Sequence, residues 1–377
     1  MSGPEIRPMA IRNAFGAWLI SRGLVIGSLA VARHVFEFAG VGKWTGPLGQ
    51  GLTSWDASHY AEISRFGYGG VAHESLRFFP LLPLLGRLAE AVTPFHSGQG
   101  IVVVANVVSL LFFLRLYGFV HRETKFDSAI AARAVWIAAL APPAFIFVMG
   151  YAESLFLLCA VSALDAARRG RWLRVAPWAF AAGLTRPPGT LLAIPIAIEA
   201  LLAWRAAGYS FAPKRRLVAQ LVATAAAPAG MLSFLWWARR STKTFFEPLR
   251  IHERTNLRGG TENPISSVWD AFRDLLAGDR VGSGMHFFSA IAIFWLLIVL
   301  WRHAPRSLFA YGLASALVAL SAANLDSLER YALATVPFIL AAAIVVRHKT
   351  VERGCLIAGS AGIVTMSFLA FSGALVP

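Results

Sequence analysis

The sequence predicts an all-α polytopic membrane protein with about eleven transmembrane helices, and three observations support this prediction. Of its 377 residues, 57% are hydrophobic and only 15% are charged. A soluble protein of this length needs far more charged surface, so the excess apolar side chains are expected to face lipid. The apolar residues also gather in long stretches, and Lys and Arg gather in the short segments between them. We expect residues 1–377 to form a single transmembrane domain.

Eleven apolar stretches are candidates to cross the membrane, whose hydrocarbon core takes about 20 helical residues to span. They cover residues 13–35, 99–120, 129–148, 153–167, 175–186, 189–205, 217–238, 286–301, 307–323, 332–346 and 354–375. Several are shorter than a full crossing. The first stretch is expected to be a retained span, because it lacks the usual form of a cleavable signal peptide.

The distribution of basic residues predicts the orientation. The segments that would lie inside carry Arg7, Arg12, Arg122, Lys125, Arg168, Arg169, Arg171, Arg174, Arg205, Lys214, Arg215, Arg216, Arg302, Arg306, Arg347, Lys349 and Arg353. The short turns on the other side hold only Arg186 and Arg330. Because cytoplasmic loops are enriched in Lys and Arg, the N-terminus is expected inside. The net charge of +15 therefore indicates membrane topology and not a nucleic-acid partner.

The membrane itself is expected to be a plasma membrane that the chain crosses many times. The basic residues are mostly Arg and Ala is abundant, which is typical of a bacterial gene of high GC content.

Two loops on the outer side are long, about 39–98 and 239–285. In the first, Ala57 to Phe66 is a candidate short helix. Residues 78–92 are apolar but too short to span, so they are expected to lie along the membrane interface. Loops of this length in a compact protein are usually functional or disordered. The second loop is expected to cover a site or hold an anionic substrate, unless it is an ordinary solvated loop.

Four polar clusters interrupt the apolar background, and the predicted topology places all four at the outer membrane boundary. They are Ser54–Tyr60, Gly150–Ser154, Thr185–Gly189 and Ser327–Tyr331. Ionisable residues at such positions are costly and usually line a cavity. We therefore expect the four clusters to form one site.

Asp56 is the candidate catalytic base. A sugar carried on a polyprenyl phosphate already has a good leaving group and needs no acid catalyst, whereas the acceptor hydroxyl needs a base. One carboxylate is then sufficient for an inverting single displacement, by analogy with the base of inverting glycosidases. The alternative is that Asp56 only caps the helix that follows.

Aromatic and imidazole groups flank Asp56. Trp55 and Tyr60 are candidates to stack on a sugar ring, and each is equally a candidate interfacial anchor. His59 lies one helical turn after Asp56, where it would assist the carboxylate or be an ordinary exposed loop residue.

The remaining candidate substrate-binding residues lie in the other clusters. Arg186 and Arg330 are expected to hold phosphate oxygens, although each is also placed to snorkel to the interface. Tyr331 accompanies Arg330, and Glu153 is expected to pair with one of the two Arg residues or to act in catalysis. Glu74 is a candidate for substrate contact, with a solvated loop acid as the alternative.

The motifs around these residues resemble the PIG-V-type mannosyltransferases, which include the second mannosyltransferase of GPI-anchor synthesis and bacterial relatives. The matching elements are Trp55-Asp56-Ala57-Ser58-His59-Tyr60, Phe66-Gly67-Tyr68, Glu74, Phe78-Phe79-Pro80-Leu81-Leu82-Pro83, Tyr151-Ala152-Glu153-Ser154-Leu155-Phe156, Thr185-Arg186-Pro187-Pro188-Gly189, Arg330-Tyr331 and Pro337. They extend from about residue 54 to 338. Pro188 departs from the pattern, which has Asn at this position, so a polar contact from Pro188 is in doubt.

This resemblance implies a GT-C glycosyltransferase fold and a polyprenyl-phosphate sugar donor, usually mannose. It also implies that the acid in the first outer loop, here Asp56, is catalytic, on the extracytoplasmic face. The acceptor, a lipid, glycan or protein hydroxyl, is not implied. We expect no cofactor; some GT-C enzymes use a divalent metal, but no clear set of ligands is present. The alternative function is a transporter or flippase of lipid-linked sugars, which also explains the spans and the broken helix at Arg186.

Overall fold

The computed structural model describes residues 6–40, 45–96, 98–208, 214–254, 259–278 and 281–376. Its elements are α1 (Ile6–Phe38), α2 (Gly46–Gln50), η1 (Gly51–Thr53), α3 (Asp56–Phe66), η2 (Tyr68–Gly70), η3 (His73–Arg77), α4 (Leu81–Val92), α5 (Gly100–Glu123), α6 (Ser128–Leu140), η4 (Pro142–Phe147), α7 (Glu153–Arg168), α8 (Trp172–Thr185), η5 (Pro187–Leu192), α9 (Ala193–Ala206), α10 (Lys214–Thr242), α11 (Glu247–Arg250), η6 (Ile251–Glu253), α12 (Pro264–Ala277), α13 (Val281–His303), α14 (Arg306–Leu320), α15 (Leu328–Leu333), α16 (Val336–Val345) and α17 (Lys349–Ser372). Within these ranges the only extended pairing is an isolated bridge between Thr261 and Ala322. The all-α class is confirmed.

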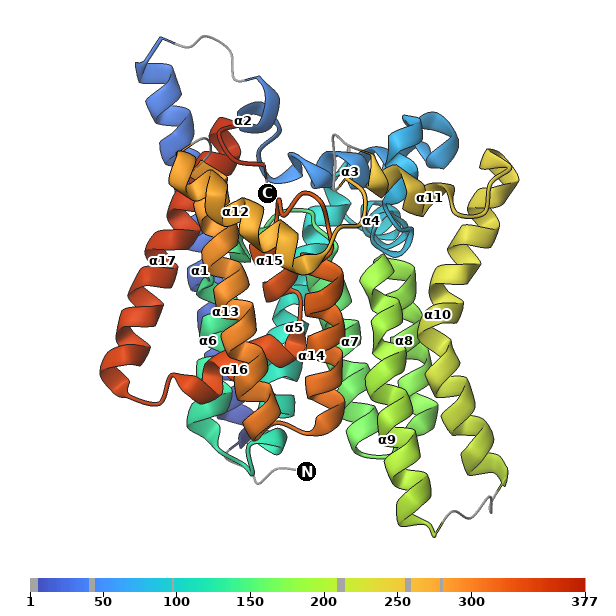
Figure 1. Ribbon diagram of the computed structural model, residues 1–377. Coiled ribbons are helices and arrows are strands. Elements are labelled where there is room, and N and C mark those ends of the chain that lie inside the picture. The colour runs from blue at the N-terminus through green and yellow to red at the C-terminus, as the bar shows by residue number, and fades with distance from the viewer. Residues whose placement is uncertain are drawn as a thin grey trace.

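The helices are arranged as a bundle of long, mostly apolar rods (Figure 1). In the described ranges, six segments are long and apolar enough to cross a membrane: Arg7–Phe38, Gly100–Glu123, Pro187–Ala206, Lys214–Arg240, Met285–His303 and Lys349–Ser372. Each of the eleven predicted spans falls on helical chain. The multi-span fold is therefore confirmed, but the number eleven is not established, because only these six have the length and composition of a full crossing.

Two of the predicted spans are not continuous helices. The stretch 129–148 ends as α6 at Leu140, and Pro142 then begins the 3₁₀ helix η4. The stretch 332–346 is divided between α15 and α16, with Pro337 in the first turn of α16. Proline has no N–H for an α-helical hydrogen bond, and it is tolerated in the first turn, where no such bond is made.

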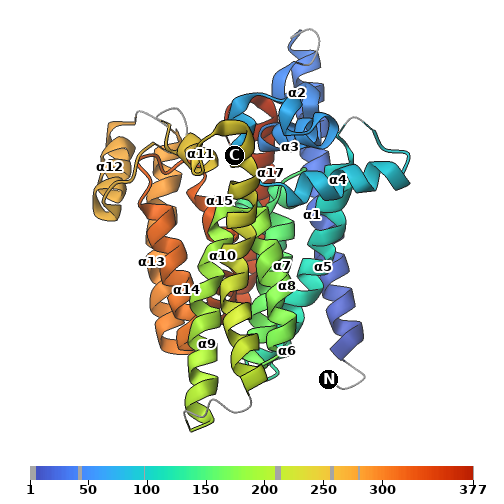
Figure 2. The same ribbon diagram turned by 90° about the vertical axis from the view of Figure 1, so that its right-hand side faces the viewer.

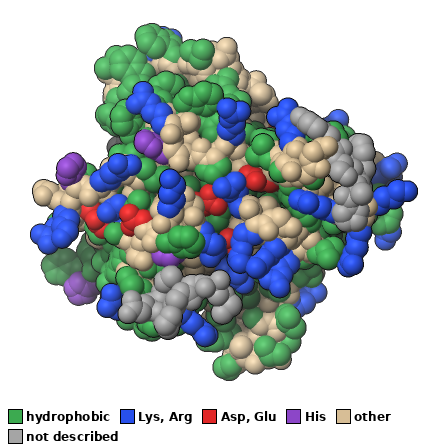
Figure 3. Space-filling view, turned by 90° about the horizontal axis from the view of Figure 1, so that it is seen from below, with side chains coloured by type: hydrophobic (Ala, Val, Ile, Leu, Met, Phe, Trp, Pro, Cys, Tyr) green, Lys and Arg blue, Asp and Glu red, His purple; other side chains and the backbone are tan. Residues whose placement is uncertain are grey.

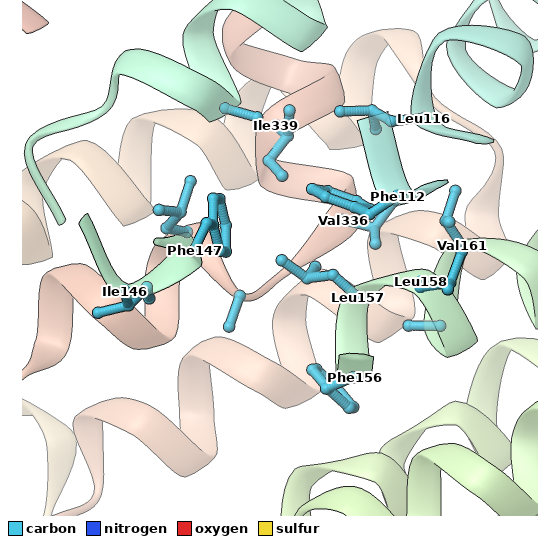
Figure 4. Close-up of a cluster of buried hydrophobic side chains, with 14 of the residues drawn as sticks. Phe112, Leu116, Ile146, Phe147, Phe156, Leu157, Leu158, Val161, Val336 and Ile339 are labelled. Carbon is cyan, nitrogen blue, oxygen red and sulfur yellow. The ribbon is translucent and has the colours of Figure 1, made fainter. Parts of the chain in front are cut away.

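The core is centred on α7, in which every residue from Glu153 to Leu164 is buried. It packs against α5 on one side and α8 on the other. Figure 4 shows Phe112 of α5, Phe147 of η4, Leu157 of α7 and Val336 of α16 in one buried cluster. A helix that is apolar on all sides and enclosed by its neighbours forms a rigid support for the residues at its end. Glu153 is the first residue of this helix.

Helices α8 and α10 begin at the same end of the bundle and pack closely along their length. This close approach requires glycine at position 230 of α10, since a Cβ there would lie 2.2 Å from the Phe180 carbonyl oxygen of α8. Small residues at helix interfaces allow backbones to approach in this way. The close packing also brings the two N-termini of these helices together.

The two ends of the bundle differ in character. One end carries the N-terminal start of α1 and the connections α5–α6, α7–α8, α9–α10, α13–α14 and α16–α17 (Figures 1 and 2). These are the segments whose basic residues were predicted to share a side, and Figure 3 shows Lys and Arg side chains spread over this end. The opposite end carries α3, α4, α11 and α12. As predicted, the basic loops lie at one end of the bundle and the polar clusters lie toward the other.

The first long loop forms short helices across the second end (Figure 2). The predicted helix 57–66 is present as α3, and the apolar segment 78–92 forms α4. On α4, Leu84, Leu88 and Val92 lie on one exposed face. An amphipathic helix with an exposed apolar face is typical of a membrane interface.

Candidate functional site

The position of Asp56 depends on an unusual backbone conformation at Trp55. Trp55 has φ +59° and ψ −130°, a region that costs a non-glycine residue about 1–3 kcal/mol. Its indole N–H donates to the carbonyl of Ala370, near the end of α17, at 2.9 Å. This long-range hydrogen bond and the packing of the ring hold the turn. Asp56 is then the first residue of α3, and the residue before that helix, Trp55, makes no side-chain cap. The alternative role of Asp56 as an N-cap is not observed.

The carboxylate of Asp56 forms an ion pair with Arg330. Arg330 Nη1 donates to Asp56 Oδ2 at 2.7 Å. The Asp56 side chain is 26% exposed, whereas that of Arg330 is 10% exposed. Arg330 comes from α15, which follows Ser327 in a left-handed conformation with φ +66°. The two short helices that carry this pair thus both start from strained non-glycine residues, which is common at functional sites.

Glu153 connects the two Arg residues of the site, Arg186 and Arg330. Its Oε1 lies 2.9 Å from Arg186 Nη1 and 3.2 Å from Arg330 Nε. The Arg330 Nε–H is buried and is not aligned for a hydrogen bond with any described residue. A buried carboxylate is very costly unless it is paired, so Glu153 and the two guanidinium groups stabilise one another. The predicted pairing of Glu153 with an Arg residue is observed with both.

Tyr331 lies against both guanidinium groups. The Arg186 guanidinium carbon is 5.3 Å from the centre of its ring, and that of Arg330 is 5.8 Å away. Cations are attracted to aromatic faces at such distances. Tyr331 therefore helps to keep Arg186 and Arg330 on the same side of Glu153.

The break between α8 and η5 directs Arg186 into the site. Arg186 is extended, with φ −158° and ψ 150°, as is typical of a residue before proline. Gly189 packs on α8, where a Cβ would lie 2.3 Å from the Ala182 carbonyl oxygen. Only glycine fits this turn, so the Pro-Pro-Gly sequence sets the direction in which the chain leaves α8. Pro188 contributes an apolar surface to the cavity described below.

These charged groups line a cavity of about 590 Å³ at the end of the bundle that carries α3. Its walls are formed by Asp56, Tyr60, Arg77, Phe78, Phe79, Glu153, Thr185, Arg186, Pro187, Pro188, Thr190, Leu191, Met231, Leu249, His252, Glu253, Gly259, Gly260, Thr261, Leu317, Val318, Ser321, Ala322, Arg330 and Tyr331. The four polar clusters predicted from the sequence thus supply Asp56, Glu153, Arg186 and Arg330 to a single cavity. The second long loop covers part of it, as one of its two predicted roles requires.

Three of the predicted substrate-binding residues do not line this cavity. Trp55 directs its indole to α17 instead. The His59 ring stacks on Phe78 with centroids 4.7 Å apart, and its Nδ1 lies 3.1 Å from Ser75 Oγ. Glu74 lies on the surface, where its carboxylate is 3.2 Å from Arg254 of the second loop. Trp55 and His59 thus support the wall around Asp56, and Glu74 links the two long loops.

Other cavity residues were not singled out from the sequence. Arg77 lines the cavity with its guanidinium carbon 4.7 Å from the centre of the Phe78 ring. Its position directly before the Phe78-Phe79-Pro80 element was the available signal. His252 and Thr190 also contribute to the wall, and neither lies in a pattern that distinguishes it from ordinary loop residues.

The surroundings of Asp56 favour its ionised form. Burial opposes ionisation, but attraction by Arg330 and Arg77 and the hydrogen bond from Arg330 outweigh it, so the pKa of Asp56 lies below its ordinary value. Burial lowers the pKa of His59, against the pull of Asp56 and with the help of Arg77. Burial also raises the pKa of Tyr60 well above its usual range. At neutral pH the cavity therefore presents an Asp56 carboxylate and a protonated Tyr60 phenol, and the imidazole of His59 behind the wall is neutral.

No group of three or more His, Cys, Asp or Glu side chains in the described ranges is placed to hold a metal ion. The ionisable side chains of the cavity are instead arranged as an alternating chain of acids and Arg residues: Asp56, Arg330, Glu153 and Arg186. Such an arrangement can accept a proton at the exposed acid and can donate hydrogen bonds to an anion.

Comparison with known proteins identifies a family that this chain matches. The model of a family described as "Mannosyltransferase (PIG-V)" matches residues 34–235. Human GPI alpha-1,6-mannosyltransferase 2 is 32% identical over 146 residues, which is 36% of this chain and 29% of that protein. The chain thus matches less than a third of the length of this relative.

Two solved structures have a related arrangement of helices. ArnT from Cupriavidus metallidurans, bound to undecaprenyl phosphate, is 14% identical with a TM-score of 0.46, over 84% of this chain and 71% of that one. The archaeal oligosaccharyltransferase AglB from Archaeoglobus fulgidus, in complex with an inhibitory peptide and a dolichol-phosphate, is 15% identical with a TM-score of 0.46. That match covers 96% of this chain and 56% of AglB.

Proposed function

This chain belongs to the PIG-V family of mannosyltransferases, and we propose that it transfers a mannosyl residue from a polyprenyl-phosphate-mannose donor to an acceptor hydroxyl. The observation that carries the proposal is the ionised, partly exposed Asp56 in a cavity that also holds Arg186 and Arg330. In this proposal the transfer inverts the configuration at the anomeric carbon. The donor phosphate leaves as the acceptor oxygen attacks from the opposite face.

Asp56 is the general base of the proposed reaction. As the acceptor oxygen bonds to the anomeric carbon, its proton passes to the Asp56 carboxylate, and the bond between carbon and phosphate oxygen breaks. Glu153 is a second acid of the cavity and is deeply buried, but its oxygen is shared between two guanidinium groups. Its contacts support a structural role in which it holds Arg186 and Arg330 together. Tyr60 and Phe78 offer apolar surface for the sugar.

The phosphate of the donor would bind between Arg186 and Arg330. Each guanidinium has five N–H donors, and Arg330 directs one of them to Asp56. Arg330 Nε also lies 3.2 Å from Glu153 Oε1, so the phosphate would contact the N–H groups of the two guanidiniums that do not face Asp56 or Glu153. A departing phosphate gains negative charge. These N–H groups therefore bind the released polyprenyl phosphate more strongly than the intact polyprenyl-phosphate-mannose.

The transfer is proposed to occur on the extracytoplasmic side. The cavity is lined by residues of α3, which lies at the end of the bundle opposite the basic segments (Figures 1 and 3), and basic segments remain on the cytoplasmic side of a membrane. The acceptor would therefore be a lipid, glycan or protein hydroxyl that is accessible from outside.

The test is Asp56→Asn in the purified full-length protein, supplied with polyprenyl-phosphate-mannose and a panel of acceptors. Loss of a general base is expected to reduce the transfer rate by about 10²- to 10⁴-fold. Glu62→Gln is the matched control, because Glu62 lies on the same helix but is exposed and outside the cavity. Mass spectrometry would detect mannosylated acceptor and free polyprenyl phosphate.

Full transfer activity in Asp56→Asn would overturn the assignment of the base. Movement of intact polyprenyl-phosphate-mannose across a vesicle membrane, with no release of free polyprenyl phosphate, would instead support a transporter or flippase.

A further inference from the structure

A second cavity, of about 400 Å³, lies at the basic end of the bundle, opposite the one that holds Asp56. It is lined by Gly170, Arg171, Trp172, Leu173, Arg174, Arg215, Arg216 and Ala219. None of these lining residues is acidic. We infer that this cavity binds the headgroup of an anionic membrane lipid that carries two phosphates. The site is separate from the proposed transfer reaction and does not depend on it.

The four Arg residues of this cavity differ from other Arg residues at the same end. Arg168 pairs with Glu123 and Glu199, each at 3.0 Å, and Arg122 pairs with Asp165 at 2.6 Å. Arg171, Arg174, Arg215 and Arg216, in contrast, make no ion pair or side-chain hydrogen bond with the described residues. Four like charges around one cavity repel each other, and an anion bound between them would relieve that repulsion.

Another feature of the cavity favours an anion. The cavity is formed where α8 begins at Trp172, beside the first described turn of α10, and the unpaired N–H groups at a helix N-terminus attract negative charge. Phosphate oxygens accept hydrogen bonds from such groups.

The surface beside the cavity indicates that the anion is a lipid. Leu173 of α8 and Val218 and Leu221 of α10 are each more than half exposed. Exposed apolar side chains on the helices of a membrane bundle face acyl chains. A basic pocket at the end of a helix pair, next to lipid-facing apolar residues, matches the recognition of multiply charged lipid headgroups. A lipid with two phosphates fits four guanidinium groups better than a lipid with one.

The test measures lipid binding to the purified full-length protein by native mass spectrometry. The lipids are diphosphatidylglycerol, phosphatidylglycerol and phosphatidylcholine, each with oleoyl chains, and inorganic pyrophosphate is a competitor. We expect diphosphatidylglycerol to bind about tenfold more tightly than phosphatidylglycerol, and the double variant R215Q/R216Q to weaken its binding by about 30-fold. Phosphatidylcholine is not expected to bind in the cavity.

The matched control is R302Q/R306Q, which removes two exposed Arg residues from the same end of the bundle outside the cavity. Its binding is expected to change by less than about threefold. R215K/R216K retains the charge and should retain part of the affinity. Equal losses in the two double Gln variants would overturn the site, because binding would then depend on overall charge. Pyrophosphate that competes as well as the lipid would overturn the assignment to a lipid.

Discussion

Two networks of Arg and carboxylate groups lie at opposite ends of this bundle, and only one of them opens on a large cavity. At one end, Arg168 joins Glu123 of α5 to Glu199 of α9, and Ser307 of α14 also donates to Glu199. At the other end, Arg330 joins Asp56 to Glu153. None of the Arg168 group lines the cavity of Asp56, whereas every member of the Arg330 group does. The same pair of functional groups thus cross-links helices in one place and forms a proposed reaction site in the other.

The two networks differ in whether all of their N–H and carboxylate groups are paired. The Arg168 guanidinium directs all three of its nitrogens to carboxylates. In the Arg330 group, a buried N–H has no aligned acceptor and one carboxylate is a quarter exposed. A network that is complete by itself stabilises the fold, and one that is incomplete is able to bind a ligand.

The largest effect is expected from a matched pair of substitutions, Arg330→Lys and Arg168→Lys, which tests whether the two networks differ in function. Lysine keeps the charge but loses the planar fork that contacts two groups at once. Arg330→Lys is expected to reduce kcat/KM for mannosyl transfer by about 100-fold, because both Asp56 and the proposed phosphate position lose their orientation. Arg168→Lys should change kcat/KM by less than about twofold and act mainly on thermal stability. Equal losses of activity in both variants would contradict the division between a structural and a reactive network.

A smaller effect is expected from Trp55→Phe. The substitution keeps an aromatic ring but removes the hydrogen bond to Ala370 that holds the strained turn before Asp56. We expect a loss of about 1 kcal/mol in unfolding free energy and a fall in kcat of about fivefold, with an unchanged KM for the donor. Thermal denaturation and steady-state kinetics measure the two effects. A large rise in donor KM with normal kcat would indicate that Trp55 contacts the sugar after all.

The smallest effect is expected from pH. Because the pKa of Asp56 is below its ordinary value, Asp56 stays ionised as the pH falls through the range where free carboxylates begin to protonate. The stability that its pairing contributes is present above the unfolded pKa and is lost only as pH falls through the lower folded pKa. The transfer rate should change by less than about twofold between pH 5 and 7. An acid limb centred in this range would indicate a different base, and His59→Gln would then test the nearest imidazole.

Much of the fold could be predicted because its determinants are local. Apolar stretches and the distribution of Lys and Arg identified the helices and the two ends of the bundle, since hydrocarbon thickness and loop charge act on each segment separately. Proline marked the break at Pro187 for the same reason. The spans 129–148 and 332–346 were predicted as continuous because burial in protein, not crossing of lipid, accounts for much of their apolar character.

The sequence predicted which charged residues form the site, but not which of them contact each other. Asp56, Glu153, Arg186 and Arg330 were recognisable as polar interruptions in an apolar chain. The hydrogen bond between Asp56 and Arg330 joins residues 274 positions apart, and no local pattern specifies it. His59 and Glu74 were predicted at the site from their neighbours in sequence, but the direction of a side chain on a short helix depends on what packs against it.

The sequence by itself thus determined that this protein is a multi-span helical bundle with an acid and two Arg residues at one end. Composition and periodicity are sufficient for that, because lipid and water sort side chains without reference to the rest of the fold. Only the tertiary structure decided that Glu153 joins the two Arg residues, that Trp55 supports Asp56 and does not line the cavity, and that the second loop forms part of the wall. Those outcomes depend on contacts between distant segments, which exist only once the helices have packed.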